Sequence, residues 1–106
     1  MRTNALIGAL LAIFAAPVSA REGDLEVEQG LAIVSLYCAD CHAVERTGES
    51  PHPEAPPFRD LHLRYDVEWL SEGLVEGLVS GHPDMPEFEF DPVQAEAIVV
   101  YLKSLE

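Results

Sequence analysis

Five consecutive residues carry the clearest chemical pattern in the chain, Cys38-Ala39-Asp40-Cys41-His42. The pattern is C-x-x-C-H, which is typical of covalent haem attachment. Two thiols one helical turn apart can add across the two vinyl groups of a single haem, and the adjacent histidine can then bind the iron as its proximal ligand. We therefore predict that Cys38 and Cys41 hold one haem c through thioether bonds, with His42 on the iron.

Other interpretations of this motif compete with haem attachment. A thioredoxin-like redox pair expects a βαβ setting that the chain lacks. A structural disulfide between the only two cysteines would close almost no loop and would add little stability. A zinc site would need further ligands, for which His52, His62 and His82 are present without a recognised spacing, and a chance match is the remaining alternative.

A second iron ligand is suggested by Met85, the only methionine besides the initiator. It lies between Asp84 and Pro86 in a proline-flanked loop, so packing on an apolar helix face does not explain it. A thioether opposite a histidine favours the reduced iron and raises the reduction potential. Met85 is the predicted distal ligand, and His82 and then His62 are the alternatives, which would give a bis-histidine haem of lower potential.

Three helices and two proline-rich loops are predicted to position these side chains in an all-α fold. Asp66 and Asp91 are suitable helix caps, and Gly81 is a suitable stop for the second helix. Tyr65 and Trp69 are expected to pack in the core, with lining of the haem pocket as the alternative. The predicted elements are a helix over 24–41, a loop over 47–57, a helix over 66–80, a loop over 81–90 and a helix over 91–105.

The first twenty residues have the composition of a secretory signal peptide. Arg2 precedes an apolar run over 5–16, and Val18-Ser19-Ala20 forms a small-residue cleavage site. The run is shorter than the roughly 20 residues that span a bilayer, so no membrane span is predicted after cleavage, and an uncleaved anchor is the alternative. We predict a signal peptide at 1–20 and one periplasmic or otherwise extracytoplasmic domain at 21–106.

The chain is strongly acidic, with a formal net charge of −13. Such a charge repels phosphate backbones, so a nucleic acid partner is excluded. It would attract a basic protein surface and raise the association rate, although an acidic surface kept only for solubility is an equal alternative. We expect a basic surface on a redox partner to dock on the side of Met85, where four acids gather, namely Asp84, Glu87, Glu89 and Asp91.

The chain resembles a class I c-type cytochrome, a small mono-haem cytochrome c, over nearly all of residues 21–106. The C-x-x-C-H motif is the specific feature, and weaker features occur in the order that the family shows. These are Gly30 eight residues before Cys38, Ala55-Pro56-Pro57-Phe58, Met85-Pro86 with Phe88, and the closing segment over 98–105.

This resemblance implies a cytochrome c-like fold in which loops enclose one haem and the first and last helices cross near Gly30 and Tyr101. It also implies that the carbonyl of Pro57 accepts a hydrogen bond from the other ring nitrogen of the proximal histidine, which would fix the orientation of that ring. Val34 is a departure, because many members have an aromatic residue there. The packing of the crossing is therefore open.

The expected function is that of a monomeric one-electron carrier between extracytoplasmic redox partners, not an enzyme. The rival is a haem subunit or domain whose iron keeps an open position, as in a small-ligand sensor or a peroxidase-like enzyme. Binding of carbon monoxide to the reduced protein separates the two.

Overall fold

The computed structural model describes residues 8, 10, 12 and 18–106. Most of the predicted signal peptide lies outside the described residues. The described part is helical, with one isolated antiparallel bridge between Leu78 and Phe88, so the all-α fold class is confirmed. The elements in chain order are α1 (Val18–Tyr37), the 3₁₀ helices η1 (Phe58–Leu63) and η2 (Val67–Trp69), α2 (Leu70–Glu76) and α3 (Pro92–Ser104).

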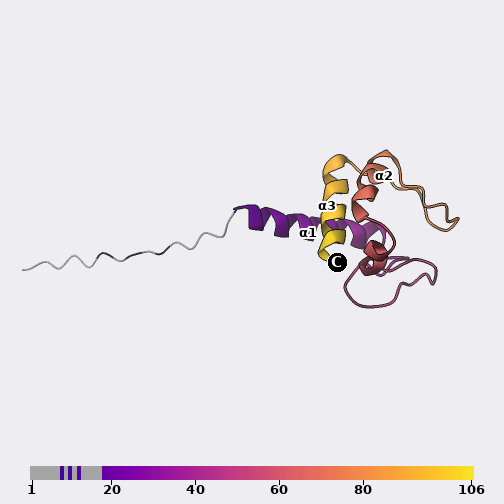
Figure 1. Ribbon diagram of the computed structural model, residues 1–106, viewed down its shortest axis with the longest axis horizontal. Helices are drawn as coiled ribbons and strands as arrows, with labels where there is room; N and C mark the ends of the chain where they lie inside the picture. Colours follow the sequence, from indigo (N-terminus) through magenta and orange to yellow (C-terminus); the bar gives the residue numbers. More distant parts are fainter. Residues whose placement is uncertain (1–7, 9, 11, 13–17) are drawn as a thin grey trace, which may run out of the picture.

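The crossing of α1 and α3 forms the centre of the fold (Figure 1). Gly30 makes the close approach possible, because a Cβ there would lie 2.1 Å from the carbonyl oxygen of Ala97 and 2.5 Å from Cβ of Tyr101. Val34, one turn further along α1, is fully buried in the same core. The predicted crossing near Gly30 and Tyr101 is therefore confirmed, and a valine fills the position at which many family members have an aromatic side chain.

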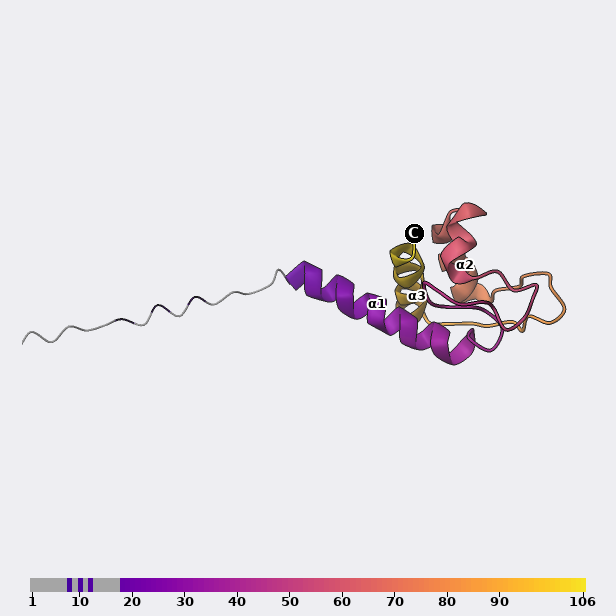
Figure 2. The same cartoon turned by 90° about the horizontal axis from the view of Figure 1, so that it is seen from below.

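The final helix begins as the sequence predicts. The Asp91 side chain accepts a hydrogen bond from the backbone of Gln94, and the Gln94 side chain accepts one from the backbone of Asp91, which is a capping box. Pro92 occupies the first helical position, where its missing N–H is no loss. Helix α3 then packs on α1 and on the shorter helices. Figure 2 shows from below where α3 crosses α1.

The second helical region is shorter than predicted. Asp66 caps it, since its side chain accepts from the backbone N–H of Glu68, but the region starts as η2 and ends with Glu76 at the end of α2. Gly77 ends the helix with a φ of +114°, a conformation that favours glycine, so the predicted stop at Gly81 is wrong. The next residue, Leu78, then pairs with Phe88, and this pair forms the base of a long loop.

Two further expectations need correction. Helix α1 ends at Tyr37, and a separate turn, in which the N–H of His42 donates to Cys38 O at 2.9 Å, follows it. The prediction that Trp69 packs in the core is wrong, because Trp69 is 74 % exposed, whereas Tyr65 is half-buried against the core. The short helix η1 was not expected, since Phe58 and Leu61 alone are too few to define a helical period.

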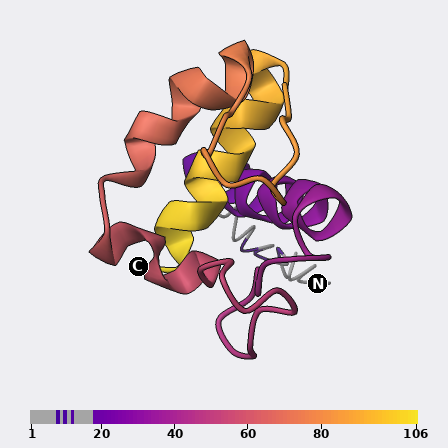
Figure 3. The ribbon, with the colours of Figure 1, turned by 90° about the vertical axis from the view of Figure 1, so that its right-hand side faces the viewer.

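Helix α3 also anchors the segment that follows the C-x-x-C-H motif. The Tyr101 hydroxyl donates to the carbonyl oxygen of Val44 at 2.5 Å, and the Arg46 guanidinium donates to the carbonyl oxygen of Ser104 at 2.6 Å. Figure 3 shows the loop after this segment extending away from the helices. The segment after the motif is thus held against α3, and the segment before it is α1, which crosses α3.

Candidate functional site

A large pocket of about 940 Å³ lies among the helices and the two loops. Its walls are mainly apolar side chains from α1, η1, α2 and α3, including Val34, Phe58, Leu61, Leu74, Ile98 and Leu102. No charged side chain among the described residues is buried, so the charged groups near the pocket lie at its rim. An apolar cavity of this size with a few polar groups suits a bulky organic cofactor better than a solvated ion.

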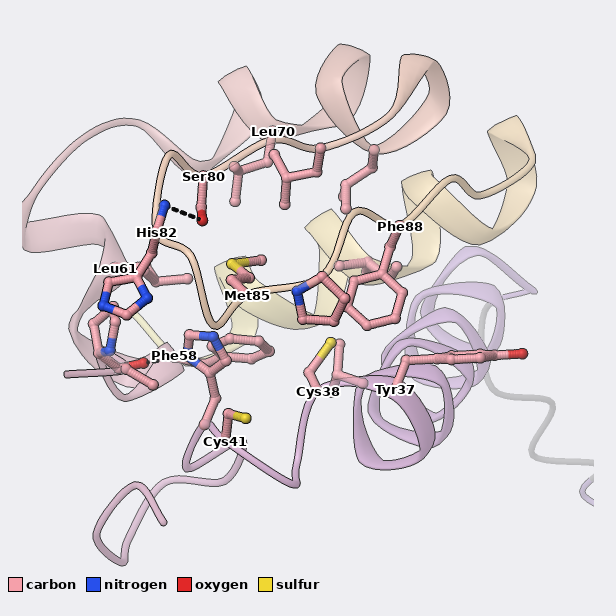
Figure 4. A pocket seen from close by; sticks show the side chains of 18 of the residues that line it. Tyr37, Cys38, Cys41, Phe58, Leu61, Leu70, Ser80, His82, Met85 and Phe88 are labelled. Atoms are coloured by element: carbon pink, nitrogen blue, oxygen red, sulfur yellow. Dashed lines mark hydrogen bonds between the residues drawn. The ribbon is translucent and has the colours of Figure 1, made fainter. Parts of the chain in front are cut away.

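Both cysteines of the motif line this pocket. Cys38 follows the last residue of α1 and Cys41 lies on the turn after it, and both side chains carry free thiols (Figure 4). Burial raises the pKa of the Cys38 thiol to about 11, so this group is protonated at neutral pH. The structure therefore brings two separate thiols to the wall of one apolar cavity.

His42 is oriented by a backbone carbonyl, but the carbonyl is not the predicted one. Nδ1 of His42 lies 2.7 Å from the carbonyl oxygen of Pro56. The carbonyl of Pro57 instead accepts from the N–H of Asp60 at 3.0 Å, because Pro57 precedes η1 and its carbonyl closes the first turn of that helix. The assignment to Pro57 is therefore wrong by one residue.

The bond to Pro56 settles the tautomer of His42. A carbonyl only accepts, so the proton of the neutral ring lies on Nδ1 and Nε2 keeps a lone pair that can bind a metal ion. The ring also packs beside Phe58, with 4.8 Å between the ring centroids. These two contacts hold the imidazole at the pocket wall next to the cysteines.

Met85 lines the same pocket from the loop between α2 and α3. Figure 4 shows its thioether directed into the space above Cys38 and Cys41. The base of the loop is fixed by the N–H of Leu78, which donates to Phe88 O at 2.9 Å. The structure thus brings all four side chains predicted from the sequence, Cys38, Cys41, His42 and Met85, to one cavity.

The alternative histidines are less suited to bind a metal ion. His62 is exposed and does not line the pocket. His82 does line it, but its Nδ1 accepts from the N–H of Asp84 at 3.2 Å, which places the ring proton on Nε2, and Nε2 lies 2.6 Å from the Glu54 carboxylate. His52 has the same arrangement with different partners. Of the three histidines that line the pocket, only His42 has a free Nε2 lone pair.

The residues present fit a covalently held haem. The pocket supplies two free thiols, an imidazole with an available nitrogen, a thioether and an apolar lining. Sequence reasoning missed Pro56, since two adjacent prolines offer equivalent carbonyls. It also missed Arg64, which lines the pocket. The only indication in the sequence was that Arg64 is adjacent to Tyr65.

The comparisons with known proteins agree with this site. The sequence model of the family described as "Cytochrome c" matches residues 27–106. The chain is 30 % identical to a protein named cytochrome c-552 from Bradyrhizobium diazoefficiens over 96 residues, which cover 91 % of this chain and 88 % of that protein. No solved structure matches the chain significantly.

Proposed function

Because this chain belongs to the cytochrome c family, we propose that it carries single electrons between extracytoplasmic redox partners through one haem c. The family holds haem c covalently through the C-x-x-C-H motif, and Cys38, Cys41 and His42 supply that motif here. When bound, haem c supplies an iron that accepts and returns one electron. The observation that carries the proposal is that both thiols, His42 and Met85 line one pocket.

In this proposal two side chains that line the pocket, His42 and Met85, would hold the iron. Nε2 of His42 is the proximal ligand, and the hydrogen bond from its Nδ1 to Pro56 keeps the ring in one orientation and raises its basicity. The Met85 thioether would supply the second ligand. With both ligands supplied by the protein, no substrate would have to bind and the apolar walls would limit access of water, so electron transfer would require little rearrangement.

Absorption spectra of the holoprotein test the ligands. We expect haem that survives denaturing extraction, a low-spin reduced spectrum, and the weak far-red band of methionine-bound ferric haem. Reduced wild-type protein should bind carbon monoxide poorly, whereas the Met85→Ala variant should bind it readily. A high-spin wild-type protein that binds carbon monoxide as well as Met85→Ala does would favour the ligand-binding sensor or enzyme instead.

Docking is proposed to use the acidic surface beside Met85. Glu87, Glu89 and Asp91 are exposed there, and Asp84 is exposed but bonded to His52. This surface would attract a basic patch on the partner, mainly through the association rate and in a salt-dependent way. An acidic surface is also what the composition favours, since the sequence contains 19 aspartate and glutamate residues and only six lysine and arginine residues.

Small charged redox reagents can test the docking surface without a known partner. The rate with a cationic reagent such as hexaammineruthenium(II) should fall as salt is added, and the Glu87→Gln/Glu89→Gln variant should slow it. The matched control is Glu22→Gln/Glu28→Gln, which removes the same charge from exposed positions of α1. Equal effects of the two variants would show that only the net charge matters and would remove the argument for this surface.

Export and a monomeric state belong to the same proposal. The signal-peptide character of residues 1–20 supports a periplasmic or otherwise extracytoplasmic location. Among the residues that the structure describes, no helix combines the length and the apolar character needed to cross a bilayer. Mass spectrometry of the exported protein, with a start at Arg21 expected, tests the cleavage, and retention of residues 1–20 would contradict it.

A further inference from the structure

Two short segments with the same pattern lie at the rim of the pocket. Residues 52–54 read His-Pro-Glu and residues 82–84 read His-Pro-Asp, so each is a histidine, a proline and an acid in that order. The first lies in the loop between the C-x-x-C-H motif and Pro56, and the second ends one residue before Met85. Their histidines both line the pocket.

Each segment folds into the same local turn. The N–H of Glu54 donates to Nδ1 of His52 at 3.1 Å, and the N–H of Asp84 donates to Nδ1 of His82 at 3.2 Å. A backbone N–H only donates, so Nδ1 is the acceptor in both rings and the ring proton lies on Nε2. Each turn therefore presents one N–H donor and one carboxylate acceptor outward.

The two turns bind each other crosswise. Nε2 of His52 donates to the Asp84 carboxylate at 3.0 Å, and Nε2 of His82 donates to the Glu54 carboxylate at 2.6 Å. The two rings meet edge to face, with centroids 5.6 Å apart. We call these four residues, His52, Glu54, His82 and Asp84, the loop clasp. Each of the two bonds keeps the partners of the other bond close together. The two bonds therefore stabilise one another, although the carboxylates are exposed.

The loop clasp joins two stretches of chain that carry the contacts of the site. Glu54 is two residues from Pro56, whose carbonyl orients His42, and Asp84 is adjacent to Met85. The far end of the Met85 loop is fixed at the pairing of Leu78 with Phe88. The loop is thus held at its base by backbone bonds and near Met85 by the loop clasp.

A divalent cation is the competing occupant of this cluster. Ligand atoms of His52, Glu54 and Asp84 lie within 4.8 Å of one another, which is a spacing from which a cation site can form. However, a neutral histidine binds a metal ion through a nitrogen that carries no proton, and the proton on each Nε2 already points to a carboxylate. The hydrogen bonds therefore favour a closed clasp without an ion.

We propose that the loop clasp is a positioning device for Met85, which holds the thioether over the pocket and limits its exchange for outside ligands. This inference rests on the proposed function, in which Met85 binds the haem iron. Opening the clasp leaves the helices and the base of the loop intact but frees the end of the loop next to Met85. Displacement of the thioether by an added ligand then becomes easier.

Imidazole exchange on the oxidised holoprotein tests this role, with loss of the far-red band as the readout. Glu54→Gln/Asp84→Asn removes both charged acceptors and should raise the apparent imidazole affinity by about tenfold, given two exposed charge-assisted pairs. Glu54→Asp/Asp84→Glu retains two carboxylates and should restore most of the wild-type resistance. Glu49→Gln/Glu76→Gln is the matched control, because it removes the same charge from exposed positions near the two loops and should change little.

The outcomes separate this inference from the proposed function. A wild-type protein without the far-red band would overturn methionine ligation and the positioning role with it. A wild-type protein with the band, and a clasp variant that binds imidazole no better than the control, would overturn the loop clasp alone. An imidazole affinity of the wild type that rises to the variant's value on addition of EDTA would replace the hydrogen-bonded clasp with a cation site.

Discussion

Substitution of Gly30 tests the helix crossing on which the fold depends. In Gly30→Ala the new Cβ would lie 2.1 Å from Ala97 O and 2.5 Å from Cβ of Tyr101. Ordinary contacts between such atoms are about 3.5 Å, so α1 and α3 must move apart by about 1 Å. The obstacles are backbone or directly attached to it and cannot rotate away. Overpacking of this kind costs about 1–3 kcal/mol, and we expect the upper end.

The matched control lies on the same helix. A Cβ at Gly23 meets no atom within 4 Å, so Gly23→Ala should leave stability unchanged or raise it by up to about 1 kcal/mol through helix propensity. For a domain of this size, a loss of 3 kcal/mol lowers the melting temperature by about 12–24 °C. Thermal unfolding of both holoproteins by circular dichroism measures the difference. Equal melting temperatures for the two variants would refute the close crossing.

Two further predictions concern the cofactor and the link between α3 and the motif. The Cys38→Ala/Cys41→Ala protein cannot attach haem covalently, so its pocket of about 940 Å³ is left empty and the protein should be largely unfolded by circular dichroism. A cooperative, native-like melt would contradict this. Burial raises the pKa of the Tyr101 hydroxyl above 10.0, so the folded state holds this proton more tightly than the unfolded chain, and the free energy of unfolding should fall as the pH rises past about 10. Tyr101→Phe should be less stable at pH 7 by about 1–3 kcal/mol, since the carbonyl of Val44 loses its donor, and its stability should fall less at high pH. Urea unfolding measures both effects. A pH dependence equal to that of the wild type would show that other groups cause the loss of stability.

The sequence alone was sufficient where chemistry is local. The C-x-x-C-H motif requires its residues to be adjacent, so Cys38, Cys41 and His42 could be named before any fold was known. The caps at Asp66 and Asp91 are likewise local, and both are confirmed. Met85 could be named because a lone methionine between polar and proline neighbours has no packing role.

The rest depended on how distant segments meet. Gly77 and Gly81 are both possible helix ends, and the choice of Gly77 follows from the pairing of the next residue with Phe88. Pro56 and Pro57 could both offer a carbonyl to His42. The structure decides between them because the start of η1 uses the carbonyl of Pro57. The exposure of Trp69 depends on the rotation of η2 against α3, which no local pattern fixes.

The crossing of α1 with α3 also governs when the domain can close. Gly30 and Ala97 lie near opposite ends of the matched segment 27–106, so α1 can meet its main packing partner only once the chain as far as Ala97 is available. A long loop must close before contacts so far apart in sequence can form, and this entropy cost slows their formation. Until then the thiols of Cys38 and Cys41 remain accessible to solvent. This order of events suits a cofactor that has to be attached covalently before the walls of its pocket assemble around it.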